Sequence, residues 1–214
     1  MNVRTRRRHR RGEGDKLRDE IIAAAQDLLV ETASEDAVSI RAVADAVGIT
    51  PPSIYRHFAD KDMLLLEVCR ANFTTFAQAL EELPPEHDPV DRLQQLGRAY
   101  MAYAKEYPEH YRMMFMARYE LSAQVYAEEM VADGSSFGLL LRTMQEVIDS
   151  GVLRPEVAER GPLHLGILFW SMVHGLASLF VAKPGLPWPD HDELVDDLLA
   201  ISIRGILADP GLLD

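Results

Sequence analysis

Apolar residues recur every three or four positions along most of the chain, which is the spacing of one face of an α-helix. The first such stripe predicts a helix over residues 16–33 and consists of Leu17, Ile21, Ala25, Leu28 and Leu29. No stretch alternates apolar and polar residues clearly enough to predict a strand. The pattern therefore predicts an all-α protein.

Capping residues and helix breakers divide the start of the chain into four helices. Ser39 is a candidate N-cap of the second helix, and Gly48 suits a left-handed residue at its end. Thr50 and the two prolines that follow it suit the start of a short third helix over residues 50–57. Asp60 is a candidate N-cap of a fourth helix. Together they predict a compact group of helices at the start of the chain.

The rest of the chain predicts a larger helical part. Pro108 and Pro162 suit the first turns of two of its helices, where a missing N–H group costs little. The helices are expected at residues 89–106, 108–117, 120–131, 136–150, 162–183 and 190–208.

One of these helices is long enough to span a membrane. Residues 163–182 contain no Asp, Glu, Lys or Arg. Their histidines and serines, and flanks without a charge asymmetry, favour a buried helix instead, and no membrane is expected. Small residues share one face of this helix and would let a second helix approach closely, as a dimer bundle needs: Ser171, Gly175, Ser178 and Ala182. The last helix, which is apolar at Leu194, Leu198, Ile201 and Leu207, could complete the bundle.

The short third helix combines apolar anchors with polar side chains. Ile54 and Phe58 can hold it to the core, which leaves Ser53, Tyr55 and Arg56 to point elsewhere. A helix, a tight turn and a short helix with a polar face form a helix-turn-helix, whose second helix enters the DNA major groove. An arginine there can donate hydrogen bonds to guanine or to phosphate. The alternative interpretation is a structural hairpin with a solvated polar face.

Charge is distributed unevenly along the chain. The formal net charge is −12, and the acidic excess falls after residue 70. Residues 4–11, "RTRRRHRR", hold six arginines and no acid. An acidic body with one basic end suits a protein that touches a polyanion at that end, and basic arms can reach into the minor groove. Residues 1–15 are expected to form a disordered basic arm.

Residues 21–68 closely resemble the N-terminal domain of TetR-family transcriptional regulators. The motifs that carry the resemblance are the second helix "IRAVADAVG", the recognition helix "IYRHF" and the following "KDMLL". The resemblance implies an all-helical homodimer. It also implies an N-terminal three-helix helix-turn-helix DNA-binding domain, residues 16–70, and a larger helical domain, residues 71–214, that binds a small-molecule effector and dimerises.

The same resemblance implies roles for individual side chains. Arg41 and residues 50–57 are the implied base readers, whereas Ser39, Tyr55, His57 and Lys61 are implied phosphate contacts. Pro52 departs from the family pattern, because many members have glycine or another small residue there. The expected DNA-contacting residues are Ser39, Arg41, Thr50, Pro52, Ser53, Tyr55, Arg56, His57 and Lys61, together with Arg7 and Arg8 of the arm.

A stretch rich in tyrosine and methionine predicts the effector pocket. Residues 100–119 hold five tyrosines and four methionines, which adapt to varied apolar guests and supply hydroxyl groups. Plain core packing is the alternative for any one of them. The segment "FWSMVHG" (169–175) also resembles a tryptophan-histidine-glycine signature of one TetR subfamily. The expected pocket residues are Tyr103, Tyr107, Tyr111, Met114, Phe115, Trp170, Met172 and His174.

Catalytic and metal-binding motifs are weak. The segment "GSSFG" (134–138) matches a nucleophile elbow, but a helical pattern precedes it where that motif needs a strand, so Ser135 or Ser136 is expected to cap a helix. Glu106 and His110 lie one helical turn apart, and two ligands alone make a poor metal site. The single cysteine, Cys69, excludes an intrachain disulfide and favours a cytoplasmic protein. We therefore expect no enzyme activity, no metal and no cofactor.

These observations predict a ligand-responsive transcriptional repressor. Its expected partners are a near-palindromic double-stranded DNA operator, a largely apolar small-molecule effector that releases the protein from DNA, and a second copy bound through the last two helices. Two alternatives remain open: a helical small-molecule binding protein that does not bind DNA, and a helical hydrolase that uses Ser136.

Overall fold

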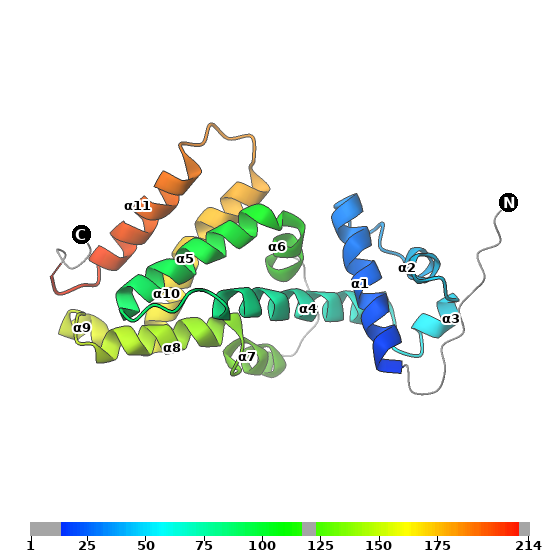
Figure 1. Cartoon of the computed structure of the whole chain (residues 1–214), viewed down its shortest axis with the longest axis horizontal. Coiled ribbons are helices and arrows are strands. Elements are labelled where there is room, and N and C mark those ends of the chain that lie inside the picture. The colour runs from blue at the N-terminus through cyan, green and yellow to red at the C-terminus, as the bar shows by residue number, and fades with distance from the viewer. Residues whose placement is uncertain (1–13, 117–122, 210–214) are drawn as a thin grey trace. The chain divides into compact units, whose positions relative to one another are not determined.

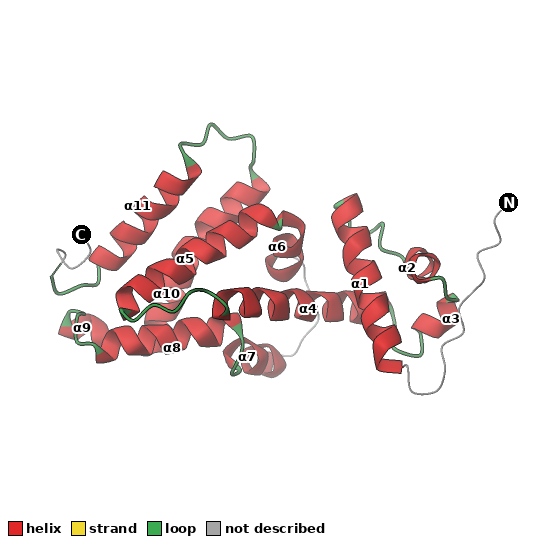
Figure 2. Ribbon diagram, in the orientation of Figure 1, coloured by secondary structure: helices red, strands yellow, loops and turns green. Residues whose placement is uncertain are grey.

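The computed structural model describes residues 14–116 and 123–209. Figure 2 shows that these residues form helices joined by loops. Between them they contain no strand, only an isolated antiparallel bridge between Leu153 and Leu207. The prediction of an all-α fold is confirmed.

The described chain divides into two compact units. The first contains residues 14–72 and 112–116, and the second contains residues 73–111 and 123–209. One long helix, α4 (Lys61–Glu81), begins in the first unit and ends in the second.

The first unit contains α1 (Gly14–Thr32), α2 (Ile40–Val47), α3 (Pro51–Ile54) and the start of α4 (Figure 1). The predicted stripe on α1 faces the core, with Leu17, Ile21, Ala25 and Leu29 buried. On α4, Leu64, Leu65, Val68 and Cys69 are buried. The helical spacing of apolar residues therefore gave the correct buried face for α1.

The predicted boundaries of α2 and α4 are confirmed by their caps. The Ser39 hydroxyl accepts a hydrogen bond from the Ala42 amide at 3.1 Å. Gly48 ends α2 with a φ of 79°, a left-handed conformation that glycine adopts without steric cost. The Asp60 carboxylate accepts from the Met63 amide at 2.8 Å. These short polar contacts satisfy amide groups that the first turn of a helix leaves unpaired.

The third helix is shorter than predicted. It covers only Pro51–Ile54 rather than residues 50–57, and residues 55–57 form a turn. The prolines do start it as expected, with Thr50 at the N-cap position. The Thr50 hydroxyl, however, lies 3.1 Å from the Ser53 hydroxyl instead of capping an amide. Four residues complete one helical turn, and the chain must then turn to begin α4 at Lys61.

The second unit is a bundle. Its helices include α5 (Pro89–Glu106), α7 (Ala123–Val131), α8 (Ser136–Asp149), α10 (Gly161–Ala182) and α11 (His191–Arg204), and α6 (Pro108–Phe115) begins in it. Helices α5, α8 and α10 pack against one another, α11 packs on α5 and α10, and α7 packs on α8. Figure 1 shows α5 and α10 alongside each other, with α11 departing from them toward its N-terminal end.

Gly97 sets the closest approach of α5 to α11. A Cβ atom at this position would lie 2.4 Å from Cδ2 of Leu199 on α11 and 3.3 Å from Cζ of Phe169 on α10. Leu199 is fully buried. The absence of a side chain at Gly97 therefore lets the two neighbouring helices pack directly on the α5 backbone.

The expectation that residues 163–182 form a buried helix is only half correct. Helix α10 is long and apolar enough to cross a membrane by length and composition, but one face is buried and the other is exposed. Phe169, Val173 and Ala177 face the core. The exposed face carries apolar side chains without any charge: Leu163, Ile167, Leu168, Met172 and Leu179. An exposed apolar stripe of this kind is typical of an interaction surface.

One further helix and one helix end differ from the prediction. A single turn, α9 (Pro155–Ala158), was not predicted because four residues carry no periodic pattern. Helix α11 ends at Arg204 rather than at residue 208, because the chain then extends to pair with the segment after α8. The Arg154 amide donates to the Ile206 carbonyl at 3.1 Å, and the Ala208 amide donates to the Val152 carbonyl at 2.9 Å.

Candidate functional site

Residues 50–58, here called the recognition segment, are held to the first unit by two side chains. Ile54 is fully buried and Phe58 nearly so. Their spacing of four residues places both on the inward side of one turn. The Phe58 amide and the His57 amide both donate to the Ile54 carbonyl, at 3.0 and 2.8 Å, which fixes the turn after α3. Ile54 and Phe58 therefore anchor the buried side of the recognition segment, and the backbone hydrogen bonds fix its turn.

The polar side chains of the recognition segment point outward. Tyr55 is 55% exposed, Pro52 and Arg56 are exposed, and Ser53 and His57 are partly exposed. Arg41, on the preceding helix, is exposed as well. In residues 14–116 and 123–209, neither Arg41 nor Arg56 has an ion-pair partner. Two uncommitted guanidinium groups beside a phenol form a surface that suits a polyanion.

Two of the predicted phosphate contacts already have intramolecular roles. The Ser39 hydroxyl caps α2, and the Lys61 ammonium donates to the Glu35 carbonyl at 2.6 Å. Both side chains keep further capacity, because a hydroxyl can still donate and an ammonium has three donors. Arg7 and Arg8, which were predicted to contact DNA from the arm, lie outside the described residues.

An ionic cluster supports the recognition segment from the side of α1. The Arg18 guanidinium is hydrogen-bonded to Glu67 on α4 and lies 5.3 Å from the centre of the Phe58 ring. Arg70 donates to the same carboxylate at 2.6 Å. Burial raises the pKa of Glu67, but the hydrogen bonds from Arg18 and Arg70 outweigh it and leave the pKa below 4.5. Arg18 thus links α1, α4 and the anchor residue Phe58.

A second polar group lies inside the bundle of the second unit. The Tyr100 and Tyr111 hydroxyls each lie 2.8 Å from Nδ1 of His174. Tyr111 is also 3.0 Å from the Ser178 hydroxyl, and Trp170 donates to the Tyr100 oxygen at 3.4 Å. We call these five residues the tyrosine–histidine network. It contains no carboxylate, lysine or arginine, so its polar groups satisfy one another without formal charge.

The two ring nitrogens of His174 have different partners. Nδ1 faces two phenolic hydroxyls, whereas Nε2 lies 3.4 Å from the Ser178 oxygen. A neutral imidazole carries one donor N–H and one acceptor nitrogen, so Nδ1 either accepts from one phenol or donates to one. Burial lowers the pKa of His174, which keeps the ring neutral near pH 7, and burial raises the pKa of both tyrosines. The network is therefore built from neutral groups.

Models of two protein families match the chain. Residues 21–68 match "Bacterial regulatory proteins, tetR family", and residues 93–201 match "Tetracyclin repressor-like, C-terminal domain". The first match covers the recognition segment, and the second covers α10 and the tyrosine–histidine network. The chain belongs to the TetR family of ligand-responsive, DNA-binding transcriptional regulators. Whether it falls within the tryptophan-histidine-glycine subfamily stays a prediction.

Relatives of this TetR-family protein are named as regulators. It is 23% identical over 194 residues to the uncharacterized HTH-type transcriptional regulator YobS of Bacillus subtilis, covering 87% of this chain and 93% of YobS. It is 27% identical over 127 residues to the HTH-type transcriptional activator FasR of Mycolicibacterium smegmatis, covering 59% of this chain and 58% of FasR. A solved structure from Rhodococcus sp. RHA1, of unknown function, has a TM-score of 0.73 and 26% identity, covering 89% and 95% of the two chains.

The residues predicted for the effector pocket of this TetR-family protein fall in different places. Tyr111, Trp170 and His174 meet in the tyrosine–histidine network. Met172 does not join them, because it lies on the other side of α10, where its sulfur is 3.1 Å from the Ser202 hydroxyl. Tyr107 is exposed at the C-terminal end of α5. Met114 and Phe115 belong to the other compact unit, and Met114 is buried.

Tyr103 is the predicted pocket residue with an unpaired polar atom. Its side chain is 7% exposed, and its hydroxyl has no hydrogen-bond partner in the described structure. Its ring lies 4.7 Å from that of Phe76, which in turn lies 5.4 Å from the Tyr100 ring. Burial raises the pKa of Tyr103 to about 12. A buried hydroxyl without a partner is costly, and it marks a place where a ligand group could bind.

Two members of the network were missed by sequence reasoning. Tyr100 was within the tyrosine-rich stretch but not among the expected pocket residues, and Ser178 was assigned only to a small-residue face. The signal was present on α10, because Trp170, His174 and Ser178 are spaced by four residues and share a face. No group of three or more potential metal ligands occurs among the residues that the structure describes.

Proposed function

We propose that this protein is a homodimeric TetR-family repressor that binds a near-palindromic operator and leaves it when a small molecule binds the second unit. The observation that carries the proposal is the outward polar surface of a recognition segment anchored by Ile54 and Phe58. A surface of this kind would enter the major groove, and two copies would meet successive grooves about 34–36 Å apart.

The exposed side chains divide into two proposed roles. Arg56 and Arg41 would read base edges, because a guanidinium can donate two hydrogen bonds to guanine. Tyr55, His57, Ser39 and Lys61 would hold phosphate oxygens and so fix the register of the protein on the duplex. The remaining proposed contacts are Thr50, Pro52 and Ser53 in the recognition segment, and Arg7 and Arg8 in the arm.

An operator-binding assay tests the DNA-binding part. Labelled DNA from the region upstream of the gene is titrated with wild-type protein and with Arg56→Ala, and fluorescence anisotropy is measured. Loss of a base-reading arginine should weaken specific binding by about 1–3 kcal/mol, or roughly fivefold to 150-fold. Arg160→Ala, an exposed arginine of the second unit, is the matched control. Equal affinities for the two variants would refute the assignment, and no binding at all would favour a ligand-binding protein without DNA binding.

We also propose that the last two helices form the dimer interface. The exposed face of α10 carries no charge, and Ile201 on α11 is 73% exposed. A Cβ atom at Gly175 would meet no neighbouring atom, so this position leaves room for another helix. A stable protein–protein interface buries about 1,200–2,000 Å² of accessible surface in total, and exposed apolar faces of this kind form its centre.

Light scattering after gel filtration tests the interface. Leu168→Glu places a carboxylate on the exposed apolar face of α10 without touching the core, and it should convert dimers to monomers. Val30→Glu changes a residue that is equally exposed on α1, and it should leave the mass unchanged. A dimer that persists in Leu168→Glu, or one lost equally in both variants, would place the interface elsewhere.

The proposed effector site includes Tyr103, Trp170 and His174. Their surroundings are apolar and uncharged, so they suit a largely apolar ligand with one neutral hydrogen-bonding group. The unpaired Tyr103 hydroxyl is the group proposed to bind it. Tyr103→Phe should then weaken effector-induced release of the operator and leave operator affinity in the absence of effector unchanged. If release is unaltered, the pocket does not include this hydroxyl.

The direction of regulation is also part of the proposal. FasR is named an activator, so membership in the family is compatible with either repression or activation. A reporter gene behind the upstream region tests it: deletion of the regulator should raise expression if it is a repressor and lower it if it is an activator. The proposed location is the cytoplasm, where an operator is accessible, and no enzymatic activity is proposed.

A further inference from the structure

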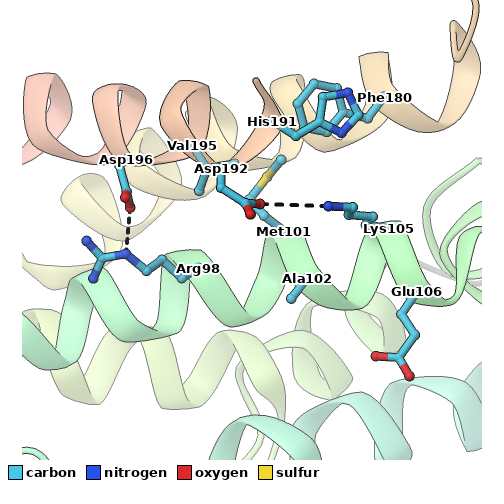
Figure 3. Close-up of a pocket in the computed structure, with 10 residues that line it drawn as sticks. All are labelled: Arg98, Met101, Ala102, Lys105, Glu106, Phe180, His191, Asp192, Val195 and Asp196. Carbon is cyan, nitrogen blue, oxygen red and sulfur yellow. Dashed lines mark hydrogen bonds and ion pairs between the residues drawn. The ribbon is translucent and has the colours of Figure 1, made fainter. Parts of the chain in front are cut away.

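A groove lies between α5 and α11, away from the tyrosine–histidine network and the exposed face of α10. Its volume is about 540 Å³, within the usual range of small-molecule sites. The buried side chains Met101 and Val195 line it, and Phe180 lines it from the end of α10. Arg98 and Asp196 lie at one end of the groove, and Lys105 and His191 lie toward the other (Figure 3). None of the residues predicted for the effector pocket lines this groove.

One wall of the groove is aromatic. The Phe180 and His191 rings are stacked, with centroids 4.2 Å apart and an interplanar angle of 16°. Trp188 meets the edge of Phe180 at 4.7 Å and 90°. Its indole N–H donates to the Lys183 carbonyl at 3.0 Å, which fixes the loop before α11. Aromatic faces attract cations as well as apolar groups, because their π-systems are electron-rich.

The charges around the groove favour a positively charged ligand. Three carboxylates line the groove, those of Glu106, Asp192 and Asp196, against the two cations Arg98 and Lys105. Further carboxylates stand at the start of α11 outside the groove: Asp190, Glu193 and Asp197. The Asp190 carboxylate accepts hydrogen bonds from the Asp192 and Glu193 amides. The N-terminus of α11 is therefore already capped by a carboxylate of the protein itself. This excess of carboxylates would repel an anionic ligand.

Two ion pairs cross the groove, and they differ in strength. Arg98 bonds Asp196 at 2.7 Å, whereas the Lys105 ammonium is 3.7 Å from Asp192 (Figure 3). Lys105 and Asp192 are 60% and 90% exposed at their side chains, so this pair contributes little stability. A ligand cation could replace the lysine as the partner of Asp192 at small cost.

We propose that this groove is a binding site for amphipathic organic cations, with the apolar body against Met101, Val195 and Phe180 and the positive charge facing Asp192. The site is separate from the proposed effector pocket. Binding itself does not depend on the proposed function. Any effect on the operator does rest on it, because α11 is one of the two helices proposed to form the dimer interface.

A pair of probes with the same shape and opposite charge tests the proposal. Tetraphenylphosphonium and tetraphenylborate are titrated into the full-length wild-type protein by calorimetry. The cation should bind at least about tenfold more tightly than the anion, because the rim is acidic. Equal binding, or tighter binding of the borate, would overturn the proposal, since the groove would then be only an apolar surface.

Matched variants locate the site. Asp192→Asn should weaken phosphonium binding about threefold to tenfold, whereas Glu193→Gln, an exposed neighbour on α11 that does not line the groove, should change it less than about twofold. Ala102→Phe fills the groove from an exposed position and should abolish binding, whereas Ala79→Phe on the exposed side of α4 should not. Thermal unfolding confirms that each variant is folded. Equal effects of Asp192→Asn and Glu193→Gln, or full binding by Ala102→Phe, would refute the site.

Tryptophan fluorescence gives an independent local readout. The chain has two tryptophans, and Trp188 packs against the groove residue Phe180. A fluorescence change on phosphonium binding should therefore disappear in Trp188→Phe and persist in Trp170→Phe. The reverse result would place the cation at the tyrosine–histidine network and overturn the proposal. These measurements need no DNA, so failure of operator binding would refute the proposed function and leave this result standing.

Discussion

The two units use the same kinds of side chain in opposite ways. In the recognition segment, Tyr55 and His57 are turned toward solvent, while apolar neighbours hold the backbone. In the second unit, Tyr111 and His174 are turned inward and bond to each other. A polar group that faces water keeps its hydrogen-bonding capacity for a partner, whereas one that is buried must be satisfied at once. Tyrosine and histidine therefore indicate an intermolecular surface in one unit and an internal network in the other.

The comparison also separates anchoring from recognition. In the first unit, Ile54 and Phe58 supply stability and Arg56 supplies the proposed chemistry, so the two functions fall on different residues. In the second unit, Tyr111 and His174 carry both stability and any proposed ligand chemistry. In the first unit, a substitution should therefore be able to change DNA binding without changing stability. In the second unit, a substitution in the tyrosine–histidine network should change stability and ligand binding together.

The largest expected effect comes from removing the anchor of the recognition segment. Ile54→Ala should lower the free energy of unfolding by about 2–5 kcal/mol, because a fully buried side chain is replaced by a cavity. Operator binding should be lost with it. Val30→Ala, at a position exposed on α1, should change stability by less than about 0.5 kcal/mol. Urea denaturation measures both, and similar values for the two would mean that the segment is not anchored by Ile54.

Next in size is the loss of one hydroxyl from the tyrosine–histidine network. Tyr111→Phe should lower stability by about 1–3 kcal/mol, because the His174 ring and Ser178 lose a buried partner. The same change at the exposed Tyr55 should leave stability unaltered and weaken only operator binding. Thermal unfolding and anisotropy together test this contrast. If Tyr55→Phe proves the more destabilising of the two, the assignment of inward and outward roles is wrong.

Helix caps give a smaller effect that still distinguishes the units. Ser39 caps α2 and Ser135 caps α8, each through its hydroxyl to an amide. Replacement of either by alanine should lower stability by about 1 kcal/mol. Only Ser39→Ala should also weaken operator binding, because Ser39 is a proposed phosphate contact in the first unit. An equal loss of DNA affinity in Ser135→Ala would show that the loss follows stability rather than contact.

The smallest expected effect is a pH dependence from His174. Its pKa is lowered by burial, so the unfolded chain takes up a proton more readily than the folded one. The contribution of His174 to the free energy of unfolding is fully present above pH 6.5, the ordinary pKa of histidine. This contribution declines as the pH falls from 6.5 toward the lower pKa of the folded state. His174→Gln should reduce the slope of unfolding free energy between pH 7 and 5. Part of the slope should remain, because burial also lowers the pKa of His110.

Urea denaturation at a series of pH values measures the slope. If His174→Gln leaves it unchanged, this ring does not carry the pH dependence.

The sequence by itself determined most of the helical framework. The apolar spacing located the long helices, and Ser39, Gly48 and Asp60 marked boundaries that their hydrogen bonds and φ angle confirm. These features depend on neighbours within about four residues, which is the range of the α-helical hydrogen bond. The outward polar surface of the recognition segment could be predicted for the same reason, because Ile54 and Phe58 fix one side of a single turn.

Only the tertiary structure decided which residues from distant helices meet. His174 bonds Tyr100 and Tyr111 from positions more than sixty residues away in the chain, and the groove between α5 and α11 is lined by residues from both helices and from the end of α10. Helix periodicity assigns a residue to a face but does not identify the helix packed against it. The sequence therefore could not show that Met172 contacts Ser202 on α11 and lies apart from Trp170 and His174. Nor could it show which face of α10 its neighbouring helices leave exposed.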